Sequence, residues 1–331
     1  MQFKNYTKRF FLISTFVLFI IFSFTIIVDP YNVTEYNLLN IKYKSVRDNR
    51  LQKIGQIKKL KKIDNLILGS SRSERLNPKT VDKILGGYTY TFGTGGANLE
   101  DALGLILYLK RENKLPKNII LCIDFSAFRK DLPTPAGFYK IPEINFLKTN
   151  DITYQNYTSK LFSLEAFRSA FKTFKRDLKD KTPESFVDGN GFLVKKNIFP
   201  SGNMDKIKQV ANEYYNFGYK KGELEFSEVR FNYLKEIIKI SKQHNIDLYI
   251  MLTPVHKYLY DMIANNKKLL DKMYYIKDRL ANIYPYYDAM ILDENTKNKN
   301  NFSDAVHTNI IMGDLLLNKL LKDKGYIKWM Y

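Results

Sequence analysis

Short apolar runs that alternate with helical patterns constrain the fold of this chain more than any other feature. Such runs occur at residues 65–68, 88–92, 119–123, 246–252 and 287–291. Apolar residues also recur at helical spacing over 98–112, 227–243 and 308–323. Nearly continuous apolar strands are typical of parallel sheets that helices cover on both faces. We therefore expect an α/β fold, a three-layer sandwich around a mostly parallel five-stranded sheet.

An uncharged apolar run at residues 10–28 predicts a transmembrane anchor before this domain. At about 1.5 Å per residue it spans roughly 28 Å, close to the hydrocarbon thickness of a bilayer. Lys4, Lys8 and Arg9 precede it, so the positive-inside rule places residues 1–9 in the cytoplasm and the rest outside the cytoplasmic membrane. A cleaved signal peptide would need a small-residue cleavage motif, which is missing here. A buried core helix fits poorly, because the run is apolar on every face.

The rest of the chain divides by composition. Pro30 ends the anchor, and the polar, basic residues 29–62 predict a stalk. One domain is expected over 63–325. Within it, residues 130–225 interrupt the alternating pattern with prolines and a glycine-containing turn, although one helix is expected at 161–177. We interpret 130–225 as an insertion or cap beside the active site.

The formal net charge of +19 favours anionic partners such as lipid headgroups, acidic glycans or nucleic acid. A solvated lysine surface is the simpler interpretation. No zinc knuckle, helix-turn-helix or RNP pattern is present, so we do not expect nucleic acid as a partner. Cys122 is the only cysteine and lies in an apolar run, which excludes an intramolecular disulfide. With one cysteine and three histidines we expect no zinc site, and we expect no cofactor.

Two candidate catalytic features follow the first two predicted strands. Ser71 comes after Gly69-Ser70, where a hydroxyl would lie at the carboxyl edge of the sheet near a helix N-terminus. The alternative is an ordinary cap of the next helix. The loop 93–96 holds three glycines, which allow backbone N–H groups to approach a substrate, or which simply form a turn. A dinucleotide-binding loop would instead follow the first strand.

Two further features contain histidine. Asp304 precedes His307 by three residues, just before the last predicted helix, and such an acid can orient the imidazole of a general base. The alternative is that Asp304 or Thr308 caps that helix. His256 follows the fourth predicted strand, where a side chain either lines a pocket or belongs to a surface turn.

The order of these features resembles the SGNH/GDSL hydrolase superfamily over residues 64–128 and 245–323. Residues 69–71 look like its first block, with Ser70 in place of the usual Asp; 91–96 look like its second block, and 304–307 like its final D-x-x-H. The resemblance implies a flavodoxin-like SGNH fold, with Ser71 as the nucleophile, His307 as the base and Asp304 as its orienter. It places the N–H groups of Ser71 and Gly96 in an oxyanion hole. Ser70 and Ser73 are rival nucleophiles.

One block departs from the family pattern. The third predicted strand ends at Asp124-Phe125-Ser126, without the Asn that the family uses as an oxyanion donor. Losing one such donor typically costs about 10²–10³ in rate, so another donor substitutes, the activity is weak, or the reaction differs. The candidate substrate-binding residues are Arg72, Asp124, Ser126 and His256. The Asn-less third block is more similar to the membrane-anchored branch of the superfamily, which includes the teichoic acid D-alanyl transfer protein and the alginate acetylation proteins.

The sequence thus predicts an extracytoplasmic serine esterase or O-acyltransferase that acts on acyl groups, such as O-acetyl, of a cell-envelope polysaccharide. A membrane O-acyltransferase is a candidate partner, and the lipid bilayer is expected to hold the N-terminal helix. The competing hypothesis is a catalytically inactive glycan-binding or scaffold protein of an envelope polysaccharide assembly system. The missing Asn is its main support.

Overall fold

A five-stranded parallel sheet forms the centre of the computed structural model, which describes residues 2–31, 38–44, 49–139, 141, 143–147, 161–195, 202–220 and 224–322. Its order is β2-β1-β3-β6-β7. The bounds are β1 Asn65–Gly69, β2 Thr89–Gly93, β3 Asn118–Ile123, β6 Asp247–Leu252 and β7 Tyr287–Asp288. The predicted α/β fold with a parallel five-stranded sheet is confirmed, although β7 is shorter than the 287–291 run suggested. Strand β2 is added on one side of β1, and β3 and the later strands are added on the other side. The position between β1 and β3 is therefore the topological switch point of a doubly wound sheet.

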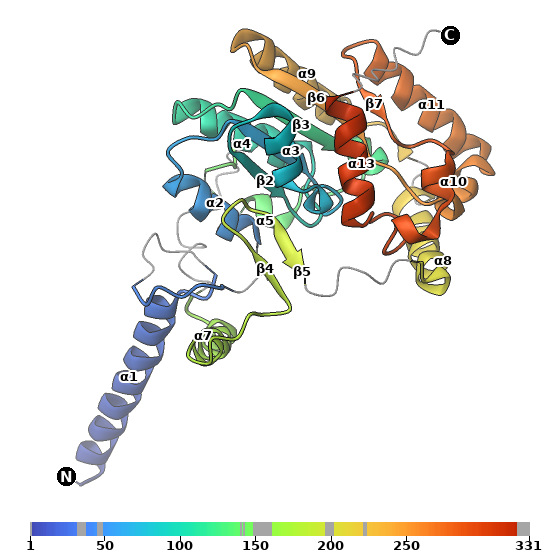
Figure 1. Ribbon diagram of the computed structural model, residues 1–331. Coiled ribbons are helices and arrows are strands. Elements are labelled where there is room, and N and C mark those ends of the chain that lie inside the picture. The colour runs from blue at the N-terminus through green and yellow to red at the C-terminus, as the bar shows by residue number, and fades with distance from the viewer. Residues whose placement is uncertain are drawn as a thin grey trace.

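Both faces of the sheet are buried, because successive strand residues point to opposite sides. On one face, strand residues such as Leu68 and Leu121 pack in the larger core with α4 Leu99–Arg111, α9 Glu228–Gln243 and α11 Lys267–Ala281. On the other face, residues such as Ile67 and Ile120 pack with α3 Pro78–Leu85 and α13 Ile310–Leu321. These helices form the two outer layers of the domain (Figure 1). The remaining elements are α1 Gln2–Val28, α2 Asn49–Lys59, α5 Ala136–Tyr139, α7 Leu164–Asp177, β4 Ser185–Val187, β5 Leu193–Lys195, α8 Met204–Glu213, a π-helix Tyr214–Tyr219, α10 Lys257–Ala264 and α12 Glu294–Lys297.

Helix α1 extends away from the globular part of the molecule (Figure 1). Its segment Asn5–Val28 has a mean hydropathy of 2.8 and is long and apolar enough to cross a membrane. Most of its large apolar side chains, such as Phe11 and Phe19, are exposed in the protein. The helix ends where Asp29 adopts a positive φ of 43° and Pro30 follows.

The prediction of a stalk over residues 29–62 is wrong for α2. Leu51, Ile54 and Ile57 of this helix are fully buried in the larger core. Their spacing of three residues places them on one helix face, and the polar residues between them hid this stripe in the sequence. Helix α2 therefore belongs to the domain, and it carries Lys53 into the interior.

Part of the insertion covers one edge of the sheet. The N–H of Thr91 in edge strand β2 donates to the carbonyl of Asn190, in the turn between β4 and β5, over 2.8 Å. The side-chain amide of Asn190 donates to the Thr89 carbonyl over 2.9 Å. These bonds satisfy edge groups that would otherwise be open to another strand. The helix predicted at 161–177 is found as α7.

We expect the substitution Gly104→Ala to destabilise the protein, because an added Cβ would overlap the carbonyl oxygen of Ile144 in the insertion. Overpacking of this kind costs about 1–3 kcal/mol, more than the gain of about 1 kcal/mol from replacing a helical glycine. Urea unfolding of the detergent-solubilised protein measures the effect. The control is Gly189→Ala, where no atom lies within 4 Å of the new Cβ. Equal stability of the two variants would show that the insertion does not pack on α4.

Candidate active site

Ser71 lies in a tight turn at the carboxyl end of β1. Gly69 ends the strand with a φ of +147°, and a Cβ at this position would lie 2.8 Å from the backbone oxygen of Cys122 on β3. Only glycine allows this approach of the two strands. The chain then turns so that the N–H of Ser73 donates to the Ser70 carbonyl over 3.1 Å. The half-buried Ser71 lies within this turn, at the switch point where ligands of such sheets bind.

Three residues predicted to act together are in contact. Ser71 Oγ lies 2.8 Å from His307 Nε2. His307 Nδ1 lies 2.8 Å from Asp304 Oδ2. The rival serines point elsewhere: the Ser73 hydroxyl donates to the Ser70 carbonyl over 2.8 Å, and Ser70 Oγ accepts the N–H of Arg72 over 3.2 Å. Ser71 is therefore the serine of this turn that faces the imidazole.

A closed loop holds Asp304 and His307 in front of α13. Phe302 and Thr308 form an antiparallel bridge across its base, and the N–H of Ser303 donates to the His307 carbonyl over 2.9 Å. Asp304 Oδ1 accepts the N–H groups of Val306 and His307, each over 2.9 Å. The loop thus fixes both catalytic candidates by backbone hydrogen bonds.

His256 lies beneath this loop, and its burial contradicts the alternative that it belongs to a surface turn. It is buried, and its N–H donates to the Ala305 carbonyl over 2.9 Å. Its ring packs edge-on against Phe302, with centroids 5.4 Å apart, and Nδ1 accepts the N–H of Tyr258 over 3.1 Å. Burial lowers the pKa of His256, so its neutral form is favoured. His256 is a structural support for the loop, since helix capping and packing occupy its ring.

The carboxylate of Asp304 is stabilised in its charged form. Burial by itself raises its pKa, but the hydrogen bond and charge of His307, together with the two backbone N–H groups, outweigh burial and lower the pKa to about 2. A carboxylate that stays ionised can hold the proton on His307 Nδ1 and leave Nε2 to accept a proton from Ser71.

The backbone N–H groups of Ser71 and Gly96 lie at the ends of neighbouring strands. Gly69 and Gly93 are paired in the parallel register of β1 and β2, so the loops that follow start side by side. Gly96 adopts a φ of +65° and is exposed, with open space where a Cβ would lie. Among the described residues, neither of these N–H groups donates to another protein group. Both are available to a substrate oxygen.

Lys53 fixes the start of the second loop, and the sequence gives no sign of this because the polar residues 29–62 predict a stalk. Its ammonium is fully buried and donates to the Gly93 carbonyl. Burial lowers the pKa of Lys53 to about 8, and the charges of Glu74 and Asp188 oppose this shift. No local pattern in the sequence pairs residue 53 with residue 93.

Arg72 and Asp124, which the sequence suggested as substrate-binding residues, contact each other. Arg72 Nε lies 3.5 Å from Asp124 Oδ1, Nη1 donates to Thr253 Oγ1 over 3.0 Å, and Nη2 donates to the Tyr219 hydroxyl over 3.2 Å. Thr253 in turn donates to Asp124 over 2.8 Å. Burial by itself lowers the pKa of Arg72, but the charge of Asp124 together with Tyr219 and Tyr214 outweighs burial and raises the pKa above its usual value. This network binds the ends of β1, β3 and β6 to the π-helix, and Arg72 is buried within it.

An asparagine from another element, Asn98, lies near the end of β3, where the family pattern would have its own asparagine. Ser126 is half-buried in a short helical turn after Asp124, with no side-chain hydrogen bond among the described residues. A narrow recess beside it is lined by Gly69, Ser70 and Asp124 together with Asn98, which begins α4. Asn98 follows the Gly96 loop directly, and sequence analysis passed over it because the family pattern expects the amide after the third strand.

The arrangement has the parts that acyl transfer requires: a hydroxyl, an imidazole that can accept its proton, an ionised orienter, and free N–H groups for an oxyanion. Among the described residues, no group of three or more His, Cys, Asp or Glu side chains could hold a metal ion. A scan against models of known protein families finds none that matches the chain.

We expect the stability contributed by Asp304 to depend on pH. The pKa of the folded carboxyl is near 2, against about 3.8 when unfolded, so the contribution is complete above about pH 4 and is lost as the pH falls toward 2. The shift corresponds to about 2 kcal/mol. We expect the free energy of unfolding, measured in urea, to differ between wild type and Asp304→Asn by a constant amount from pH 7 to 5. This difference should become smaller below about pH 4.

The matched control for this measurement is Asp271→Asn, because Asp271 is exposed and pairs with Lys267 on the surface. Its difference from wild type should stay small at every pH. A constant Asp304→Asn difference down to pH 3 would contradict the depressed pKa.

Proposed function

We propose that this protein is a membrane-anchored serine esterase or O-acyltransferase of the SGNH/GDSL type. The observation that carries the proposal is the hydrogen-bonded series from Ser71 through His307 to Asp304, which joins residues 236 positions apart in the chain. Support for the SGNH fold comes from the parallel sheet, the serine at its switch point, and the glycine loop after the neighbouring strand.

In the proposed mechanism, Ser71 Oγ attacks the carbonyl carbon of an acyl ester while its proton passes to His307 Nε2. The resulting oxyanion accepts hydrogen bonds from the N–H groups of Ser71 and Gly96. When the intermediate collapses, the alcohol leaves with the proton held by His307, and the acyl group remains on Ser71. Water or a sugar hydroxyl then gives its proton to His307 and takes the acyl group, and His307 returns that proton to Ser71 Oγ as the bond between Oγ and the acyl carbon breaks. Asp304 stabilises the imidazolium in both half-reactions.

The proposed substrate is an O-acyl group of an extracytoplasmic glycan, because α1 would hold the domain at the membrane surface. Two basic side chains, Lys195 and Arg75, also lie close enough to Asp304 to feel its charge. Burial lowers the pKa of Lys195, and the nearby charge of Arg75 lowers it further. Basic groups at this distance favour an anionic polymer over a neutral one.

A non-catalytic glycan-binding role is the second candidate. Its support is the end of β3, where Asp124 takes the place of the family's Asn and is engaged by Arg72 and Thr253. In the catalytic proposal, Asn98 is the candidate for the missing donor, because its side chain borders the recess next to Ser70.

We expect Ser71→Ala to abolish hydrolysis of a small acetyl ester such as p-nitrophenyl acetate, and to abolish labelling by a fluorophosphonate probe. Loss of the nucleophile in a triad enzyme lowers kcat by about 10⁴–10⁶. Ser70→Ala is the matched control, because it removes the neighbouring hydroxyl, which faces its own backbone, and it should retain most of the activity.

Three outcomes separate the two candidate functions. Labelling of wild type and Ser70→Ala, but not of Ser71→Ala, supports the enzyme. Full activity of folded Ser71→Ala would reject Ser71 as the nucleophile. Absence of labelling and turnover in wild type, combined with binding of an anionic glycan, would favour the scaffold.

A further inference from the structure

Helix α7 lies against the last turns of α1, where the chain would leave the membrane (Figure 1). Three ring pairs join the two segments: Phe22 to Phe162 at 5.1 Å, Phe24 to Phe167 at 6.1 Å and Phe24 to Phe174 at 5.6 Å between centroids. At about 1.5 Å per residue, Phe22 is roughly 9 Å before the end of α1 at Val28. Interfacial helices insert to about this depth, 5–10 Å into the boundary between headgroups and acyl chains.

The surface of α7 carries an apolar stripe next to the face that packs on α1. Ala166, Ala170 and Thr173 are buried. Apolar residues then recur at alternating steps of three and four, which places them on one adjoining face: Leu164, Phe167, Phe171, Phe174 and Leu178. Leu164, Phe171 and Leu178 are 65%, 55% and 71% exposed, although each is large and apolar. Exposure of this kind marks an interaction surface.

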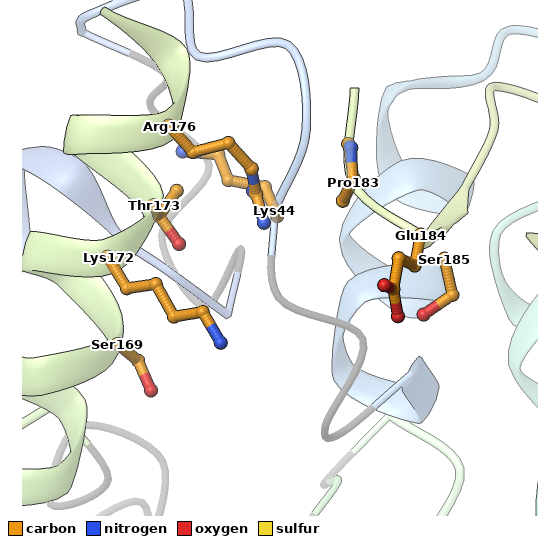
Figure 2. Close-up of a pocket in the computed structure, with 8 residues that line it drawn as sticks. All are labelled: Lys44, Ser169, Lys172, Thr173, Arg176, Pro183, Glu184 and Ser185. Atoms are coloured by element: carbon orange, nitrogen blue, oxygen red, sulfur yellow. The ribbon is translucent and has the colours of Figure 1, made fainter. Parts of the chain in front are cut away.

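The polar surface of α7 is basic. Arg168 and Lys175 flank the apolar stripe, and Lys172 and Arg176 lie farther round the helix. These four residues outnumber the acidic residues Glu165 and Asp177 in this helix. Figure 2 shows Lys172 and Arg176 of α7 beside a cavity of about 520 Å³, with Lys44 on the same side and Glu184 across it. The polar face of α7 therefore borders hydrated space beside the globular part, and the apolar stripe faces away from it.

We propose that α7 is an interfacial helix that inserts its apolar stripe into the outer part of an anionic lipid bilayer, beside the transmembrane helix α1. The stripe is continuous with α1 through Phe167 and Phe174, so the lipid that surrounds α1 also reaches α7. The flanking lysines and arginines match anionic headgroups. This role does not depend on the proposed catalytic chemistry.

The test uses the full chain reconstituted into vesicles of phosphatidylglycerol and phosphatidylcholine that carry lipids brominated near the headgroup. The single tryptophan, Trp329, is replaced by Phe, and one Trp is introduced at Phe171 of α7. The Phe171→Trp protein should show blue-shifted emission that brominated lipid quenches. Phe217→Trp is the matched control, because Phe217 is 75% exposed on the π-helix after α8, away from α1. Its emission should be neither shifted nor quenched.

A third variant, Phe16→Trp in α1, lies roughly 18 Å before Val28 and reports, with lipids brominated near the ends of the acyl chains, whether the anchor is inserted. Quenching at positions 16 and 171, but not at 217, supports the proposal. Quenching at 16 alone overturns it. Blue-shifted emission at 171 without quenching by lipid would also overturn it, since the stripe would then be covered by protein, such as a second copy or a partner's transmembrane helix. Absence of quenching at position 16 would show that α1 is not inserted in the bilayer. Since the proposal assumes this insertion, that result would reject it as well.

Discussion

The buried guanidinium of Arg72 is the constraint on which the site depends. A buried charge is very costly unless it is paired and hydrogen-bonded, so the chain must bring Asp124, Thr253 and Tyr219 around it. These partners come from the ends of β3 and β6 and from the insertion. Since Arg72 directly follows Ser71, satisfying the charge also fixes the turn that presents the hydroxyl. The carboxyl edge of the sheet is thereby held together by one ionic network beneath the candidate active site.

The candidate site uses the fold in two different ways. Backbone geometry positions the serine side, since Gly69 and the paired strands β1 and β2 determine where Ser71 and Gly96 lie. Loop closure positions the base side, because a small bridged loop supported by His256 holds Asp304 and His307. Pre-organised groups of this kind need little rearrangement during a reaction, which is how enzymes stabilise developing charge.

Much of this arrangement was predictable from local pattern. The apolar runs predicted the strands because both faces of a parallel sheet are buried, and the resemblance of three short blocks predicted which serine would face His307. Contacts between distant elements were not predictable. Tyr219 reaches Arg72 across 147 positions, and Lys53 reaches Gly93 from a helix whose average character is polar. The sequence left open whether His256 lines a pocket or belongs to a surface turn, and its contact with Phe302, which no spacing reveals, makes it a support for the loop.

Under the proposed function, the contact between α1 and the globular part determines how the site would reach a substrate. Val28 packs with Ile41 and Ala170, and the Lys44 ammonium donates to the Val28 carbonyl over 2.7 Å. A domain on a flexible linker would adopt many orientations and meet molecules at many distances from the membrane. A domain that packs against the end of its membrane anchor keeps one orientation. By lateral diffusion it then samples only a thin layer next to the membrane. A polymer segment would then have to reach the site at one fixed distance from the membrane. The position of the segment, and not only its chemistry, would therefore determine whether it is modified.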